Sequence, residues 1–208
     1  GMGGVSVSVL LLLLHQLYTL TTANTEAPKV KVSVYYETLC PDSQRFIVQQ
    51  LYPVWRDLKD IIQLDIHSFG KTVEYDGGSR FTCQHGSREC RANTMLTCAK
   101  KYIADESQFL DFVKCVMSRF TGTDAGPVCA NETRVEFEEI QRCYGGAEGL
   151  ALQHQLSLHQ AALSPSLDYV PWILVNQVFT RHQLRAAQYN LRAVVCATYE
   201  GATPAMCF

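Results

Sequence analysis

The first third of the chain alternates between strand-like and helix-like patterns of hydrophobic positions. Val30–Tyr36 (VKVSVYY) is rich in β-branched and aromatic residues, which predicts a strand. Leu64–Phe69 (LDIHSF) predicts a second strand. Between them, hydrophobic residues at helical spacing predict an amphipathic helix of about five turns. These residues are Ile47, Leu51, Val54, Trp55, Leu58 and Ile62. Strand, helix and strand together predict a βαβ unit.

From about residue 83 to residue 163 the pattern is helical throughout. The predicted helices are Glu89–Tyr102, Gln108–Phe120, Val135–Cys143 and Leu150–Leu163, with turn residues between them. A strand is then expected at Ile173–Phe179 and a last amphipathic helix at about Leu184–Tyr199. The sequence therefore predicts an α/β domain that carries a helical insertion.

The N-terminus carries an apolar run, Val5–Leu14, which is followed by the small residues Thr21, Thr22 and Ala23. This order is typical of a secretory signal peptide, which we place at residues 1–23, ahead of a domain at 29–208. A buried N-terminal strand or helix is the alternative. No later segment approaches the roughly 18 apolar residues of a membrane span, so no membrane span is expected.

The charge of the chain bears on whether it binds nucleic acid. The net charge is −2 and the basic residues are scattered, with Lys100 and Lys101 as the one adjacent pair. Nucleic-acid binding needs a basic patch or stripe, so we expect no nucleic-acid partner.

The chain has nine cysteines, and behind a signal peptide they favour disulfides. Because the number is odd, at least one of them is unpaired or pairs between chains. Cys40 stands alone, far upstream of the rest. The others are Cys83, Cys90, Cys98, Cys115, Cys129, Cys143, Cys196 and Cys207. The simplest expectation is four bridges among these eight and a free Cys40, with the pairing left open.

Cys40 is placed where the first strand ends and the helix begins with Pro41. Unpaired backbone N–H groups and the helix dipole favour a thiolate there, whereas Asp42 opposes it. The alternative is a buried, inert cysteine. In thioredoxin-like sites, a proline that follows an extended residue begins the strand that faces the active cysteine, and its peptide bond is cis. Pro171 follows Val170 in this way ahead of a predicted strand. We therefore expect a cis Val170–Pro171 bond beside Cys40. An ordinary trans proline at a strand start is the alternative.

One segment carries a family resemblance. It runs from Cys83-Gln84-His85-Gly86 through Glu89-Cys90 and Asn93 to Cys98, and it resembles the signature of the gamma-interferon-inducible lysosomal thiol reductase family. The segments 35–40 and 169–172 resemble the family's active-site lead-in and its later proline segment. The resemblance covers about residues 29–207.

The resemblance implies a thioredoxin-like fold with a disulfide-stapled helical insertion at about 83–163. It also implies reduction of disulfide-bonded protein substrates at acidic pH, in endosomes or lysosomes or after secretion, in immune or antigen-processing settings.

The sequence departs from the family at the active site, where Cys-x-x-Cys is replaced by Cys40-Pro41-Asp42-Ser43. A hydroxyl cannot resolve a mixed disulfide, so Ser43 is expected to hydrogen-bond the Cys40 thiolate instead. Turnover then needs an external thiol such as cysteine or glutathione, and no other cofactor is expected. The alternative is a secreted, catalytically weak or inactive protein that binds a partner. The strand–Cys–helix unit disfavours a third hypothesis, a lipid-binding module resembling saposins.

Two further motifs have simpler interpretations. The spacing of His85 with Cys83 and Cys90 is unlike that of zinc ligands, so no metal is expected. The signature is interpreted as a tight turn at Gly86 with disulfide staples, and direct catalysis by its residues is the alternative. Asn131-Glu132-Thr133 is an N-glycosylation sequon that we expect in an exposed turn.

Overall fold

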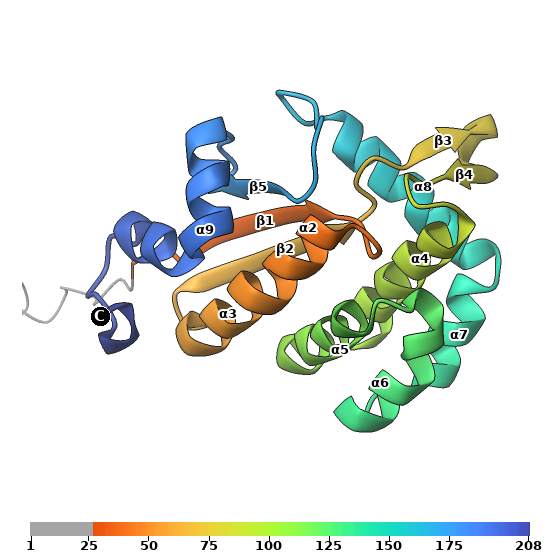
Figure 1. Cartoon of the computed structure of the whole chain (residues 1–208), viewed down its shortest axis with the longest axis horizontal. Coiled ribbons are helices and arrows are strands. Elements are labelled where there is room, and N and C mark those ends of the chain that lie inside the picture. The colour runs from red at the N-terminus through yellow and green to blue at the C-terminus, as the bar shows by residue number, and fades with distance from the viewer. Residues whose placement is uncertain (1–26) are drawn as a thin grey trace, which may run out of the picture.

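A three-stranded sheet forms the centre of the domain in a computed structural model that describes residues 27–208. Its strands are β1 (Val30–Tyr36), β2 (Ile62–Ser68) and β5 (Trp172–Val175), in the order β2-β1-β5. β1 pairs with β2 in parallel and with β5 in antiparallel orientation (Figure 1). The predicted βαβ unit is thus confirmed, while the predicted signal peptide at 1–23 lies outside the described residues.

One helical segment connects β1 to β2. It consists of α2 (Pro41–Phe46), a π-helical turn at Ile47–Leu51 and α3 (Tyr52–Leu58). Pro53 has no backbone N–H to donate to the preceding turn, which accounts for the widened turn before it. The predicted five-turn helix is confirmed up to Leu58. Its last predicted position was wrong, because Ile62 begins β2 and pairs with Val30.

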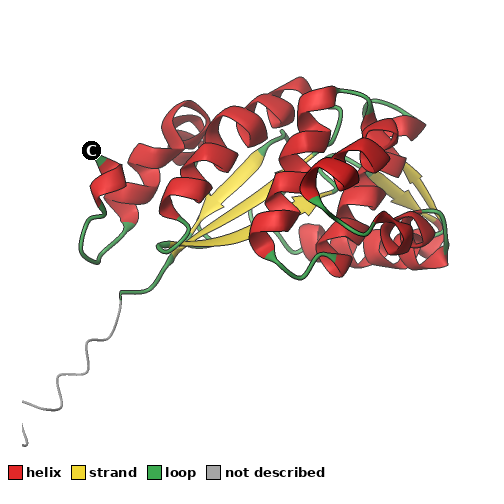
Figure 2. Cartoon of the chain, turned by 90° about the horizontal axis from the view of Figure 1, so that it is seen from below, coloured by secondary structure: helices red, strands yellow, loops and turns green. Residues whose placement is uncertain are grey.

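The sheet buries both of its faces, and β1 shows this by alternation. Val32 and Val34 belong to the main core with the α2–α3 segment and α9 (Arg181–Thr198). Tyr35 points to the other face, where it packs with Trp172 and Leu174. Figure 2 shows helices lying above the strands. The end of β1, and with it Cys40, is therefore held by packing on two sides.

The helical insertion follows β2 and lies at the end of the domain away from α9 (Figure 1). Its helices are α4 (Ser87–Tyr102), α5 (Glu106–Arg119), α6 (Gly126–Thr133), α7 (Phe137–Tyr144) and α8 (Ala147–Ala161). The four predicted helices are confirmed. The short helix α6 and a hairpin of β3 (Val73–Tyr75) and β4 (Arg80–Thr82) were not predicted. The sequon residue Asn131 is exposed as expected, but it lies within α6 and not in a turn.

Four disulfides staple the domain. The pairs are Cys83–Cys90, Cys98–Cys143, Cys115–Cys129 and Cys196–Cys207. Three lie in the insertion and the fourth fastens the C-terminal segment to α9. Among the described residues Cys40 is the free cysteine, which confirms the expected division of the nine.

The C-terminal elements are shorter or more broken than their hydrophobic patterns predict. β5 ends at Val175 because Asn176 and Gln177 take positive φ angles of 49° and 65° and turn the chain. The predicted strand to Phe179 was therefore too long. Helix α9 leaves helical geometry at Asn190, and the freed backbone N–H of Leu191 donates to Gln50 Oε1 at 3.1 Å. None of the helices in residues 27–208 has the length and apolarity that a membrane crossing requires.

Candidate active site

Cys40 is the N-cap residue of α2, as the sequence predicts. Its backbone is extended (φ −72°, ψ 120°), and its carbonyl oxygen accepts the first helical hydrogen bond, from Gln44 N–H at 2.9 Å. The side chain is 8 % exposed. The sulfur therefore lies at the positive end of the α2 dipole, in a site that is mostly closed to solvent.

Pro171 lies beside this sulfur. The Val170–Pro171 peptide bond is cis, and Cys40 Sγ lies 3.9 Å from the Val170 carbonyl oxygen. The pairing of β1 with β5 brings the two segments together, since Tyr35 pairs with Trp172. The expected geometry is present, and the catalytic role of Pro171 stays a prediction. A second cis bond, Ser164–Pro165, was not predicted.

Ser43 occupies the place of a resolving cysteine and is fully buried. Its hydroxyl oxygen accepts a hydrogen bond from the backbone N–H of Glu37 at 3.3 Å. Among the described residues, the structure does not give Ser43 the expected hydrogen bond to Cys40. The contact to Glu37 instead ties the first turn of α2 to the end of β1.

Two residues of the signature segment hold the loop that leads into Cys40. Asn93 Oδ1 accepts the backbone N–H of Thr38 at 2.9 Å, and it also accepts the Thr38 hydroxyl. Glu89 Oε2 accepts the backbone N–H of Leu39 at 3.2 Å. Both side chains are buried on α4. The sequence analysis did not predict that Glu89 and Asn93 hold this loop. The available signal was that both are polar residues in a helix with many buried positions.

The other parts of the signature act as staples, as the sequence indicates. Gly86 is the N-cap of α4 with φ +82°, and its N–H donates to the Cys83 carbonyl oxygen at 3.1 Å. A residue with a Cβ is strained at this φ, which explains the glycine. Cys83 closes onto Cys90, while Cys98 reaches further, to Cys143 on α7.

A buried pair of carboxylates meets His85 behind the loop. His85 Nδ1 lies 2.7 Å from Glu89 Oε2 and 3.7 Å from Glu37 Oε2. Burial and, second, the nearby Glu89 charge raise the pKa of Glu37 to about 7. A backbone hydrogen bond from Lys71 N–H to Glu37 Oε1 at 2.6 Å opposes that rise. The group is therefore poised to hold a proton at mildly acidic pH.

The same three side chains are the ones that could hold a cation. Donor atoms of Glu37, His85 and Glu89 all lie within 4.8 Å of one another. Cys83 and Cys90 cannot contribute thiolate ligands to a metal, because they form a disulfide with each other. Each carboxylate already accepts a backbone N–H, from Lys71 and from Leu39. We assign the cluster to holding the active-site loop.

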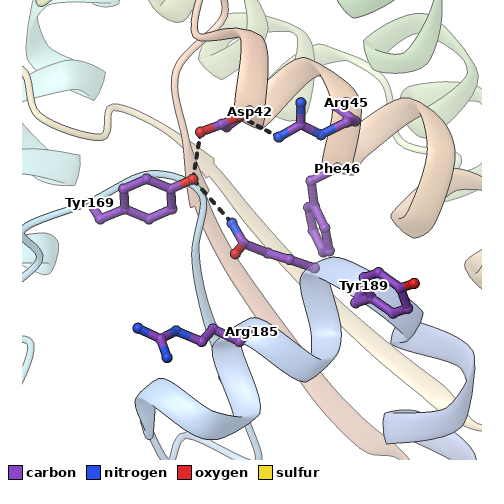
Figure 3. Close-up of a pocket in the computed structure, with 7 residues that line it drawn as sticks. Asp42, Arg45, Phe46, Tyr169, Arg185 and Tyr189 are labelled. Carbon is purple, nitrogen blue, oxygen red and sulfur yellow. Dashed lines mark hydrogen bonds and ion pairs between the residues drawn. The ribbon is translucent and has the colours of Figure 1, made fainter.

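Asp42 links the first turn of α2 to the loop before Pro171. Tyr169 donates its hydroxyl proton to Asp42 Oδ2 at 2.6 Å, and Arg45 forms an ion pair with the same carboxylate (Figure 3). Burial and, second, the hydrogen bond to Asp42 raise the pKa of Tyr169, so it remains a neutral donor. The negative charge of Asp42, two residues from Cys40, is thus partly compensated by Arg45.

Comparison with known proteins now identifies the family. Residues 31–133 match the family model described as gamma interferon inducible lysosomal thiol reductase. The goldfish (Carassius auratus) protein called gamma-interferon-inducible lysosomal thiol reductase is 35% identical over 87% of this chain and 73% of its own length. The chain belongs to the gamma-interferon-inducible lysosomal thiol reductase family. The mouse (Mus musculus) relative of that name is 34% identical over 84% of this chain and 70% of its own.

Solved structures confirm the fold that the family resemblance implies. DsbA from Mycobacterium tuberculosis superposes with a TM-score of 0.56 over 88% of this chain and 89% of its own, at 16% identity. BdbD from Bacillus subtilis superposes with a TM-score of 0.54 over 77% of this chain and 88% of its own, at 14% identity. The domain is thioredoxin-like with a helical insertion. Membership of the thiol reductase family, on this fold, supports a thiol–disulfide oxidoreductase function.

Proposed function

We propose that this member of the lysosomal thiol reductase family reduces disulfides in protein substrates through one cysteine, Cys40. The observation that carries the proposal is the placement of the free Cys40 sulfur at the N-terminus of α2, 3.9 Å from the carbonyl oxygen that precedes cis Pro171. A helix N-terminus stabilises the thiolate, which is the nucleophile in disulfide exchange.

The reaction has three exchange steps. The Cys40 thiolate attacks one sulfur of the substrate disulfide, and the other sulfur leaves as a thiolate that takes up a proton. An external thiolate then attacks the Cys40 sulfur, which releases the second substrate sulfur as a thiol. A second external thiolate attacks the external sulfur now bound to Cys40, and this step regenerates the Cys40 thiolate. In sum, one substrate disulfide becomes two thiols and two external thiols become one disulfide.

The need for an external thiol follows from the cysteines of the domain. Ser43 replaces the resolving cysteine, and the other eight cysteines are paired in disulfides. A serine hydroxyl forms no disulfide, so it leaves the mixed disulfide unresolved. Cysteine or glutathione is the external reductant that we propose.

Compartment and substrates follow from the same features. Four disulfides form and persist in an oxidising environment, which supports an endosomal or lysosomal lumen or secretion. A lysosomal setting also agrees with the names of the goldfish and mouse relatives. We propose that the substrates are disulfide-bonded proteins that are unfolded in that compartment, as in antigen processing.

A turnover assay on a denatured disulfide-bonded protein tests this function. The native chain should form a mixed disulfide through Cys40, detectable by mass spectrometry, and should turn over once cysteine or glutathione is added. Cys40→Ser should do neither. If the native chain forms no mixed disulfide at acidic or neutral pH, the protein is not a reductase. The alternative, a family scaffold that acts by binding a partner, would then be favoured.

A further inference from the structure

A pocket of about 290 Å³ lies between α2 and α9, and we call it the α2–α9 pocket. Its wall on the active-site side consists of Asp42, two residues beyond Cys40, and Tyr169, the neighbour of Val170. Both residues adjoin groups that surround the Cys40 sulfur. Cys40 itself does not line the pocket, so a molecule there lies across Asp42 and Tyr169 from a mixed disulfide on Cys40. Figure 3 shows the side chains that line it.

One positively charged side chain of the α2–α9 pocket has no partner among the described residues. Asp42 forms an ion pair with Arg45 and accepts a hydrogen bond from the Tyr169 hydroxyl. The Tyr169 hydroxyl in turn accepts a hydrogen bond from Gln188 Nε2 at 3.4 Å. Arg185, on α9, lines the same pocket and is exposed. Within residues 27–208 it makes neither an ion pair nor a side-chain hydrogen bond, and Figure 3 draws none for it. With Arg45 balanced by Asp42, the pocket has a net positive charge from Arg185.

The remaining lining is aromatic. Phe46 is buried and closes one side, and Tyr189 stands at the rim with 88 % of its surface exposed. A guanidinium group with free donors matches a carboxylate, and an exposed aromatic ring offers a surface for aliphatic or amide groups. The pocket volume is at the small end of the range for ligand sites, roughly 300 Å³, so it suits a small molecule.

We propose that the α2–α9 pocket binds the carboxylate of an anionic small thiol, with Arg185 as the cationic contact, and holds that thiol for attack on the Cys40 mixed disulfide. This proposal rests on the proposed function, because the thiol is its external reductant. A site near Cys40 raises the effective concentration of a reductant that the chain cannot supply from a second cysteine of its own.

Kinetics of resolution give the first test. A mixed disulfide between Cys40 and a neutral peptide is prepared, and its cleavage is followed with glutathione, which is anionic, and with cysteamine, which is cationic. Rate constants are expressed per thiolate. Arg185→Gln should lower the glutathione rate constant roughly three- to five-fold, the size of one partly exposed charged contact, and leave the cysteamine rate constant unchanged. Arg91→Gln is the control, because it removes the same charge from an exposed position on α4 and should change neither.

The carboxylate could instead come from an acidic side chain of the protein substrate, and a second arm separates this source. Mixed-disulfide formation is measured with acidic and neutral peptide disulfides. If Arg185→Gln slows formation with the acidic peptide but leaves resolution by glutathione unchanged, the pocket serves the substrate and the proposal is overturned. Equal effects of Arg185→Gln and Arg91→Gln on glutathione would overturn it as well.

A binding measurement keeps the proposal testable if Cys40 proves unreactive. S-methylglutathione, which cannot exchange, is titrated into the Cys40→Ser protein and followed by calorimetry or NMR. Saturable binding that is lost in Arg185→Gln and kept in Arg91→Gln supports the pocket even if the reductase function fails. Absence of saturable binding at tens of millimolar would overturn the pocket, whatever the outcome of the turnover assay.

Discussion

Asn93 Oδ1 lies 2.9 Å from the backbone nitrogen of Thr38, although 55 positions separate the two residues in the chain. Thr38 is also fixed from the other side, since its carbonyl oxygen accepts Gln44 Nε2 at 2.9 Å. The helical insertion and α2 thus both hydrogen-bond Thr38, which lies two positions before Cys40. The position of the Cys40 sulfur therefore depends on a side chain of the helical insertion.

Asn93→Ala should weaken both the fold and the site. It leaves the buried N–H of Thr38 without an acceptor, which should lower the free energy of unfolding by about 1–3 kcal/mol. The rate of Cys40 alkylation should also change, because the loop that places Cys40 loses a support. Urea unfolding and timed iodoacetamide labelling measure the two effects. Gln141→Ala, at an exposed position on α7, is the control and should stay within about 0.5 kcal/mol of the native protein.

Ser43→Cys should restore an internal resolving step. We expect disulfide reduction at low external thiol to rise at least roughly ten-fold, because an intramolecular thiol greatly exceeds a millimolar reagent in effective concentration. Turnover of a denatured disulfide-bonded protein measures this, and Cys40→Ser in the same background should abolish the gain. Ser43→Ala controls for loss of the hydrogen bond from Glu37. A bridge between Cys40 and the introduced cysteine that forms without any gain in turnover would favour the binding-protein alternative.

Alkylation of the unreduced protein should place one label, on Cys40. Labelling should be slow in the native state, because that side chain is 8 % exposed, and fast in urea. Peptide mapping should recover the four paired cysteine peptides without label, including the Cys98–Cys143 pair that joins α4 to α7. Label on any of the paired cysteines in the unreduced protein would contradict the pairing.

Glu37 should make the folded protein less stable as the pH rises. Its carboxyl group has a pKa of about 7 in the folded protein and about 4.5 in the unfolded chain, so the folded state binds more protons between these values. The free energy of unfolding should therefore fall from pH 4.5 to pH 7, by up to about 3 kcal/mol from this group.

Urea unfolding across that pH interval measures the effect. Glu37→Gln is neutral at every pH and should flatten the dependence, whereas Glu138→Gln, on a side chain that is 89% exposed, should not. A native profile that rises over the same interval, with Glu37→Gln unchanged from it, would show that the carboxyl group is ionised throughout.

Asn131 should carry an N-linked glycan when the chain passes through a secretory pathway. The residue is exposed on α6, although the sequon lies in a helix. Treatment with a peptide N-glycosidase should lower the apparent mass, and Asn131→Gln should match the treated protein. An unchanged mass after treatment would show that this sequon is not used.

Local signals predicted most of the fold. Val30–Tyr36 is a strand with the predicted bounds, because its pattern and its burial agree. The errors have local causes that a hydrophobic pattern does not contain. Pro53 widens a helical turn, and the Asn176–Gln177 turn cuts short an apolar run. The hairpin β3–β4 has three-residue strands, which are too short to show periodicity.

The candidate site divides in the same way. Cys40 and Pro171 were placed together from sequence because strand ends and helix starts are local features, and the structure brings them together. The hydrogen bonds from the loop to Glu89 and Asn93 could not be predicted from sequence. Their partners are 50 or more positions away, and such a distant contact produces no periodic pattern in the sequence. Disulfide pairing escaped prediction for the same reason.

No disulfide crosses from the insertion to the sheet in the part of the chain that the structure describes: three bridges lie between residues 83 and 143, and the fourth joins 196 to 207. The two halves of the molecule are therefore covalently independent apart from the chain itself. The joint between them is non-covalent, and it includes the hydrogen bonds at Thr38 and Leu39. This joint also has a hydrophobic part, since Met95 and Leu96 of α4 lie in the same core as Ile66 of β2. Reduction of these four disulfides therefore breaks no bond that crosses the joint.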